Sequence, residues 1–307
     1  MLAEIGVSTT FIAFIAALYA LGASLWGART RSEGTVLSAR NAVVVAFVML
    51  LIACVVMVIA LLREDYQISY VWSVSNPSMP TFFRVTALWG SQAGSLLFWS
   101  FLLSGFAAGA VLLNWHNNRR LMPYVIAYTM ATLAFFLILV IFIENPFNRY
   151  WFVGDQTLET ALIPAGGVAP TDSLLRSSAN GLNPLLRHFG MAIHPPMLYL
   201  GFIGFLIPFA FAMAALASGD LSTNWIRASR RWALAAWLFL GLGLILGGRW
   251  AYDVLGWGGY WGWDPVENAA FLPWLLGTAF LHSVMIQEKR GMLKTWNMFL
   301  VIGTFSA

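Results

Sequence analysis

Seven long apolar segments constrain this chain more than any other feature of its sequence. A transmembrane helix needs about 20 consecutive apolar residues to cross the hydrocarbon core of a bilayer. Such runs lie at residues 5–27, 41–62, 86–113, 121–144, 197–217, 232–249 and 269–287. With 60% hydrophobic and only 10% charged residues, the chain is also far more apolar than a soluble domain. We therefore expect an all-α fold, a polytopic integral membrane helical bundle with seven complete transmembrane helices.

An eighth apolar run begins at Thr295 and reaches Ala307 after thirteen residues. That length is too short to span a bilayer, so we expect a truncated eighth helix in the N-terminal part of a longer protein. Residues 1–307 are expected to form a single membrane domain, because no internal repeat or soluble domain is visible. The lone Cys54 lies within an apolar run and cannot form a disulfide within this chain, which favours a packing role.

The basic residues predict the orientation of the helices. Eleven of the seventeen Lys and Arg residues lie in the loops after the first, third, fifth and seventh runs: Arg29, Arg31, Arg40, Arg119, Arg120, Arg227, Arg230, Arg231, Lys289, Arg290 and Lys294. Cytoplasmic loops carry an excess of basic residues, so these loops should face the cytoplasm and the N-terminus should face outward. The net charge of +4 then reflects topology and requires no nucleic acid partner.

This orientation places three irregular segments on the outer face, at residues 63–84, 145–196 and 250–264. The second is expected to be an outer loop that ends in a histidine segment, and residues 250–268 a Trp-rich outer (periplasmic) loop. The stretch "GWGGYWGWDP" holds Trp257, Tyr260, Trp261 and Trp263 among four glycines. An aromatic belt at the membrane surface would explain the rings but not the glycines. Close approach to a planar apolar ligand, such as a porphyrin, would explain both.

The residues after this stretch predict how the next helix begins. Asp264 suits the N-cap, Pro265 the first helical position, and Glu267 the third position of a capping box. We therefore expect a structural role for the two acids, in preference to catalysis.

Histidine is the expected ligand for iron, because the chain has no pair of cysteines. His194 in "AIHPP" precedes two prolines, which predict a stiff extended turn at the outer surface, just before the helix at 197–217. It could instead be a helix-entry residue that bonds a carbonyl. His282 lies about 17 residues, or about 26 Å, into the last complete helix, where it could be a ligand or relay, or could snorkel to the inner interface. His188 is expected to be an exposed loop residue, and His116 is assigned no chemistry.

Two segments resemble a known family. "WAYDVLGWGGYWGWDPVENAAFLPWLLGTAFLHS", from Trp250 to Ser283, and "NPLLRHFGMAIHPPMLYLGF" resemble the WWD-domain haem-handling family, within it the CcmF-type cytochrome c haem lyases of the System I maturation pathway. The resemblance covers the whole chain, as the N-terminal part of a longer protein. One departure is at Ser91–Ala93, where Ala93 replaces an acidic residue of the family pattern. The packing of Gly90 and Gly94, four apart on one membrane helix, should survive that change.

The resemblance implies a role in cytochrome c biogenesis, as part of a haem lyase complex in the bacterial inner membrane. Haem would be a substrate at the outer site, held for attachment to the CxxCH segment of apocytochrome c, while a permanently bound haem b would occupy an inner site. The implied outer cradle is Trp257, Trp261, Trp263 and Asp264, with His194 as an axial iron ligand. His282 would ligate the inner haem iron, and both second ligands would lie beyond Ala307. The implied partners are a haem chaperone, apocytochrome c, other lyase-complex membrane subunits and the lipid bilayer.

Two other classes of protein remain open from the sequence alone. A b-type electron-transfer subunit would use His282 but would have no use for an outer Trp platform. A solute transporter would show polar residues at mid-bilayer and paired broken helices, which are sparse here.

Overall fold

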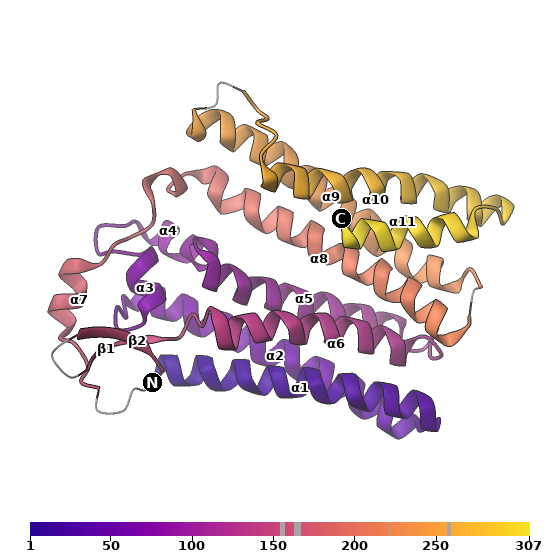
Figure 1. Cartoon of the computed structure of the whole chain (residues 1–307), viewed down its shortest axis with the longest axis horizontal. Coiled ribbons are helices and arrows are strands. Elements are labelled where there is room, and N and C mark those ends of the chain that lie inside the picture. The colour runs from indigo at the N-terminus through magenta and orange to yellow at the C-terminus, as the bar shows by residue number, and fades with distance from the viewer. Residues whose placement is uncertain (154–156, 163–166, 221, 257–258) are drawn as a thin grey trace. The chain divides into compact units, whose positions relative to one another are not determined.

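The computed structural model describes residues 1–307 except 154–156, 163–166, 221 and 257–258. Within these residues, seven helices are long and apolar enough to cross a membrane, which confirms the all-α polytopic fold. They are α1 (Leu2–Thr30), α2 (Glu33–Arg63), α5 (Gln92–Asn114), α6 (Met122–Ile138), α8 (Phe189–Ser218), α9 (Asn224–Trp250) and α10 (Pro265–Arg290) (Figure 1). The π-helical turns η2 (Leu139–Ile143) and η4 (Ala251–Leu255) prolong α6 and α9, and α11 (Lys294–Ser306) is the short eighth helix.

The segments at 63–84 and 145–196, expected to be irregular, contain short regular elements instead. The first holds α3 (Ser69–Val74) and most of α4 (Thr81–Thr86), and is followed by η1 (Ala87–Trp89). The second holds an antiparallel hairpin of β1 (Arg149–Val153) and β2 (Thr157–Ala161), then α7 (Asp172–Ser178) and η3 (Pro184–Leu186). Tertiary contacts stabilise such short elements, which local propensity alone would not form.

The chain forms two compact units. The first comprises residues 1–15, 45–101 and 134–188, and the second comprises residues 16–44, 102–133 and 189–307.

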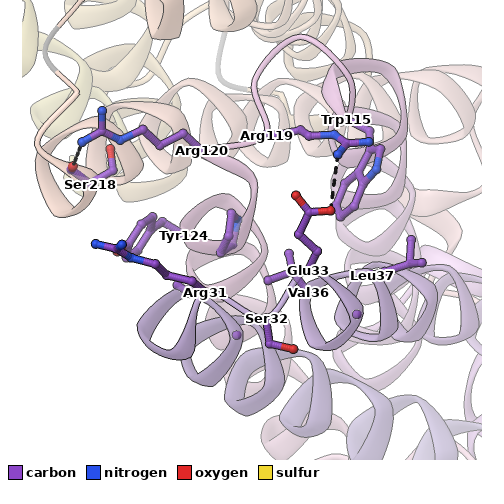
Figure 2. Close-up of a pocket in the computed structure, with 14 residues that line it drawn as sticks. Arg31, Ser32, Glu33, Val36, Leu37, Trp115, Arg119, Arg120, Tyr124 and Ser218 are labelled. Atoms are coloured by element: carbon purple, nitrogen blue, oxygen red, sulfur yellow. Dashed lines mark hydrogen bonds and ion pairs between the residues drawn. The ribbon is translucent and has the colours of Figure 1, made fainter.

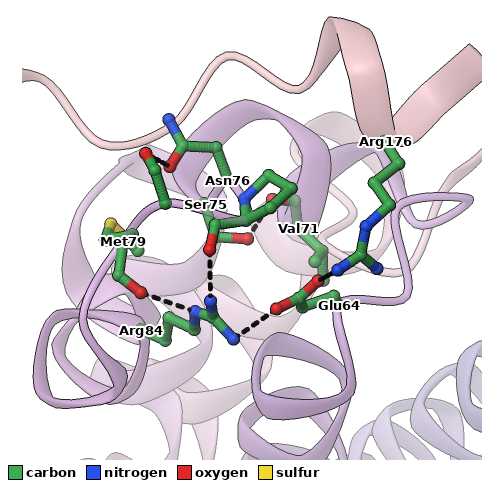
Figure 3. Close-up of polar contacts among 9 residues, drawn as sticks. Glu64, Val71, Ser75, Asn76, Met79, Arg84 and Arg176 are labelled. Carbon is green, nitrogen blue, oxygen red and sulfur yellow. Dashed lines mark hydrogen bonds and ion pairs between the residues drawn. The ribbon is translucent and has the colours of Figure 1, made fainter.

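In the first unit, a half-buried carboxylate joins three short segments (Figure 3). Glu64, just after α2, forms ion pairs with Arg84 of α4 and Arg176 of α7. Arg84 Nε also donates to the carbonyl oxygen of Met79 at 2.9 Å. Because both charges of the Glu64 and Arg84 pair are largely shielded from solvent, the loss of one partner would leave the other charge uncompensated.

The start of α5 also depends on close packing in the first unit. A Cβ at Gly94 would lie 2.1 Å from the carbonyl oxygen of Leu88 and 2.2 Å from the hydroxyl of Tyr70. A Cβ at Gly90 would lie 2.6 Å from Leu182. Both glycines therefore pack closely, as expected, but Gly90 precedes α5 and the two do not share a helix. The span expected from residue 86 begins at Gln92, because the chain first makes the η1 turn.

In the second unit, α9 packs against α8 and α10, and α11 contacts both α8 and α10 (Figure 1). The core between α8, α9 and α10 contains Leu198, Phe205, Ala236, Leu240 and Ala270. A Cβ at Gly201 would lie 2.6 Å from the backbone nitrogen of Leu240, so the α8 and α9 backbones are almost in contact. This close contact positions the side chains of the candidate site.

Candidate functional site

A complete capping box begins α10, as the sequence predicts. The backbone N–H of Glu267 donates to Asp264 Oδ1 at 2.7 Å, and Glu267 Oε2 accepts from the backbone N–H of Asp264 at 3.3 Å. The same Oε2 accepts from the N–H of Gly262 at 2.9 Å. Trp263 has a left-handed backbone with φ of 56°, which turns the chain sharply into the cap. The two carboxylates therefore hold the preceding loop at a fixed angle to α10.

An apolar groove of about 560 Å³ lies along α9 and α10, within the size range of cofactor-sized sites. Its lining residues are Trp237, Leu238, Gly241, Leu242, Leu244, Ile245, Gly248, Tyr260, Trp261, Phe271 and Trp274. Three of the rings are nearly parallel: Trp237 stacks on Trp274 at 5.6 Å, and Trp274 on Phe271 at 6.2 Å, each with an interplanar angle of 16°. Such a wall of aromatic side chains suits a large apolar ligand.

A second, smaller cavity of about 80 Å³ adjoins the groove, since Leu244, Gly248 and Trp261 line both. Its other lining residues include His194, Trp250, Asp264 and Glu267. The structure thus brings together His194, Trp261 and Asp264, three of the residues expected from the sequence.

The ring of His194 is held in one tautomer. Its Nδ1 lies 2.8 Å from the carbonyl oxygen of Gly243, and because a carbonyl can only accept, Nδ1 must carry the proton. In the neutral ring Nε2 then keeps a lone pair, the arrangement found in histidines that bind metals. The ring fits against α9 because Gly247 has no side chain: a Cβ there would lie 2.4 Å from His194 Cε1.

The expected position of His194 in an extended turn is wrong. α8 begins at Phe189, so His194, Pro195 and Pro196 all lie inside the helix. Each proline removes a backbone donor. The close packing of α8 on α9, together with the bond from His194 to Gly243, outweighs this local preference. The helix presents His194 to α9 more rigidly than a turn would.

The tryptophans in the loop and on the adjoining helix α10 differ in their surroundings. The indole N–H groups of Trp250, Trp261 and Trp274 are buried with no hydrogen-bond partner among the described residues. A buried donor without a partner is destabilising, and it suggests a site for a polar atom of a ligand or water. Trp263 is 67% exposed and lines neither cavity, although its ring meets that of Trp261 edge-on at 5.6 Å. Trp257 lies outside the described residues.

His282 lies elsewhere on α10 and lines neither cavity. Its Nδ1 is 2.8 Å from the carbonyl oxygen of Thr278, one turn earlier, so in the neutral form of this exposed ring the lone pair is on Nε2. The residue therefore has the same tautomer as His194. His116 is exposed after α5, and His188 directly precedes α8.

A family model of the cytochrome c assembly protein matches residues 89–307, which is most of the chain. The chain belongs to this family. The cytochrome c-type biogenesis protein CcmF of Pseudomonas aeruginosa is 40% identical over 310 aligned residues, and that of Escherichia coli K12 is 38% identical over 306. Both alignments cover 100% of this chain, which spans 43% and 44% of the two relatives.

A solved structure named cytochrome c heme lyase CcmF also matches this chain. The two are 32% identical with a TM-score of 0.80, over 100% of this chain and 46% of the other. The chain thus spans less than half the length of the relatives it matches. The fold of this member of the cytochrome c assembly family is therefore a multi-pass membrane fold shared with CcmF.

Sequence reasoning missed the groove walls of this cytochrome c assembly protein. Trp237, Phe271 and Trp274 lie inside apolar spans, where an aromatic residue looks like ordinary lipid-facing or core packing. A usable signal was present in "GLGLILGG", whose four glycines, Gly241, Gly243, Gly247 and Gly248, all lie on α9. Repeated glycines along one membrane helix indicate close approach by another group.

Proposed function

We propose that this chain holds haem in the groove along α9 and α10 during cytochrome c maturation. The observation that carries the proposal is His194 Nε2, left with a lone pair by the Nδ1–H bond to Gly243, in a cavity that shares Trp261 with the groove. The aromatic side chains of Trp237, Trp274 and Phe271, which line the groove, would contact the porphyrin. The partnerless indole N–H of Trp261 would find an acceptor on the bound substrate.

The sizes of the two cavities imply that a side chain must move when haem binds. The cavity of about 80 Å³ at His194 is too small for a porphyrin, whereas the groove of about 560 Å³ is in the range of cofactor sites. Because Trp261 lines both, rotation of its indole would join them and give the haem iron access to His194. The capping box at Asp264 and Glu267 would fix the end of the loop that carries this indole.

The chemistry of attachment would come from haem and from the client. Haem supplies vinyl groups, and the thiols of an apocytochrome CxxCH segment would add to them to form thioethers. The residues of this chain would bind the substrate, orient it and exclude water from one face. None of them needs to act as a nucleophile.

His282 would hold a second, resident haem b. Its Nε2 lone pair on the exposed face of α10 suits an axial ligand. A further protein ligand for each iron would come from the part of the relatives that this chain does not span. The haem b would supply electrons that keep the substrate iron ferrous.

The wider setting is part of the same proposal. Residues 1–307 would form one membrane domain of a haem lyase complex in the bacterial inner membrane, with the N-terminus and the loop at 250–268 facing outward. A haem chaperone, apocytochrome c and the other membrane subunits of the complex would be its partners.

Haem co-purification tests the groove directly. Replacing Trp261 and Trp274 by Ala should weaken haem binding at least about fivefold, because it removes two ring contacts, each worth about 0.5–1.5 kcal/mol beyond area burial. Trp26→Ala is the matched control, since Trp26 is 65% exposed on α1 and lines neither cavity. Equal haem content in all three proteins would reject the groove and favour an aromatic belt.

A further inference from the structure

A basic cavity of about 740 Å³ lies in the second unit, at the ends of five helices (Figure 2). It is formed by the turn from α1 to α2, the turn from α5 to α6, and Ser218 at the end of α8. These are the loops whose basic residues predict a cytoplasmic location. The cavity shares no lining residue with the groove or the His194 cavity.

Three guanidinium groups contribute to the cavity, and they are only partly neutralised. Arg119 Nη1 lies 3.7 Å from Glu33 Oε2, and both side chains are mostly exposed, so the pair is weak (Figure 2). Arg120 donates from Nη2 to the carbonyl oxygen of Ser218 at 3.1 Å, and it also interacts electrostatically with the carboxylate of Asp220, so two acids face three guanidinium groups. The side chain of Arg31 makes no hydrogen bond or ion pair with another described residue. The cavity is therefore positive overall.

The turn that carries Arg31 has a defined, hydrogen-bonded conformation. Arg31 has a left-handed backbone with φ of 55°, and the N–H of Ser32 bonds the carbonyl oxygen of Gly27 at 3.0 Å. The Ser32 hydroxyl is 2.8 Å from that of Thr35. Arg31 is thus presented at the cavity by a fixed backbone, which reduces the entropy lost when it binds an anion.

The remaining walls are apolar. Val36, Leu37, Pro123 and Tyr124 line the cavity together with the buried ring of Trp115. A positive rim over apolar walls, at the ends of membrane-spanning helices, matches an amphiphile with an anionic head. Basic pockets between transmembrane helices bind the headgroups of anionic lipids.

We propose that this cavity binds the phosphate-bearing headgroup of an anionic phospholipid. Arg31 and Arg120 bind the phosphate, and the apolar walls contact the glycerol and the start of an acyl chain. Free phosphate has the same anionic group as the lipid headgroup, but it has no apolar part that could contact the apolar walls.

The test uses the purified 307-residue chain in detergent, with phosphatidylglycerol, phosphatidylcholine and inorganic phosphate as separate probes. Native mass spectrometry counts the bound lipids, and a titration gives the apparent affinity. Phosphatidylglycerol should bind saturably and more tightly than phosphatidylcholine. In R31Q/R120Q its affinity should fall by about thirtyfold, because two charges close to the phosphate are lost. In R227Q/R231Q, which loses the same charge from exposed positions outside the cavity, it should change less than threefold.

A second variant leaves every charge in place. A Cβ at Gly34 meets nothing within 4 Å, and Gly34 lines the cavity on α2, so Gly34→Leu adds an apolar side chain at the cavity from a position where the Cβ is free of contacts. It should weaken phosphatidylglycerol binding at least tenfold, whereas Gly22→Leu, at an equally open site on α1 outside the cavity, should not. Equal losses in the two arginine double variants, or no loss in Gly34→Leu, would overturn the proposal. If inorganic phosphate binds and the variants weaken it to the same extent, the ligand of the cavity is a free anion and the lipid proposal is wrong.

Discussion

At the scale of single residues, the site depends on the lack of a side chain at Gly247. The His194 ring occupies the space that a Cβ at Gly247 would fill, at 2.4 Å from Cε1 and 2.8 Å from Nδ1. Gly247→Ala should therefore push the imidazole away and break its bond to Gly243, while leaving the histidine in the chain. We expect haem affinity to fall by tenfold or more, because one hydrogen bond and one tight contact are lost together.

A haem titration of the purified variants checks this expectation. Gly22→Ala is the control, because its Cβ would meet nothing within 4 Å, and alanine favours a helix by about 1 kcal/mol over glycine. If Gly247→Ala binds haem with the same affinity as the control, the position of the His194 ring against α9 does not affect haem binding.

The acid that follows Glu64 gives a pH prediction outside the spans. Burial raises the pKa of Asp65, and the nearby carboxylate of Asp172 raises it further, although Arg149 opposes the change. The folded state therefore binds this proton more readily than the unfolded state. The charged form of Asp65 therefore destabilises the fold at pH 7. This destabilisation should shrink as the pH falls through the raised pKa of the folded state and disappear below the ordinary value near 3.8. Asp65→Asn removes the charge, so it should raise Tm at pH 7 more than at pH 4.5. An equal effect at both values would contradict the direction of this shift.

At the scale of elements, the contact between α8 and α9 determines where His194 lies. A Cβ at Gly201 would lie 2.6 Å from both the backbone nitrogen and the Cα of Leu240. Backbone atoms cannot rotate aside, so Gly201→Ala must separate the helices. We expect a destabilisation of about 1–3 kcal/mol, the usual effect of overpacking. Thermal unfolding in detergent, with Gly22→Ala as the reference, would show it as a lower Tm. An unchanged Tm would mean that the helices adjust without strain.

The elements also show which parts of the fold the sequence can predict. The seven spans and the capping box at Asp264 and Glu267 follow from local rules, namely apolar length and side-chain bonds to nearby backbone groups. The helical position of His194 does not, because the prolines favour an extended backbone and only the packing on α9 reverses that preference. The groove walls, including Trp237 and Trp274, depend on contacts between residues far apart in sequence, which a single sequence does not reveal.

At the scale of the whole molecule, the orientation in the membrane is directly testable. Asn117 follows α5 and Ser78 precedes it, so one membrane crossing separates them, and both are exposed. The native Cys54 is only 6% exposed and should not react with a bulky reagent. With a membrane-impermeant maleimide and intact cells, Ser78→Cys should be labelled from outside and Asn117→Cys only after lysis. The reverse pattern would invert the proposed topology.

The central claim is that His194 holds haem at the groove, and an absorption titration of the purified 307-residue chain with haem tests it most directly. Four proteins are compared: the wild type, His194→Ala, His188→Ala and His282→Ala. If the account is right, His194→Ala loses the spectral component of the haem bound in the groove, His188→Ala matches the wild type, and His282→Ala keeps the component that His194→Ala loses. If His194→Ala binds haem with the affinity and spectrum of the wild type, the groove is not a site at which His194 ligates haem.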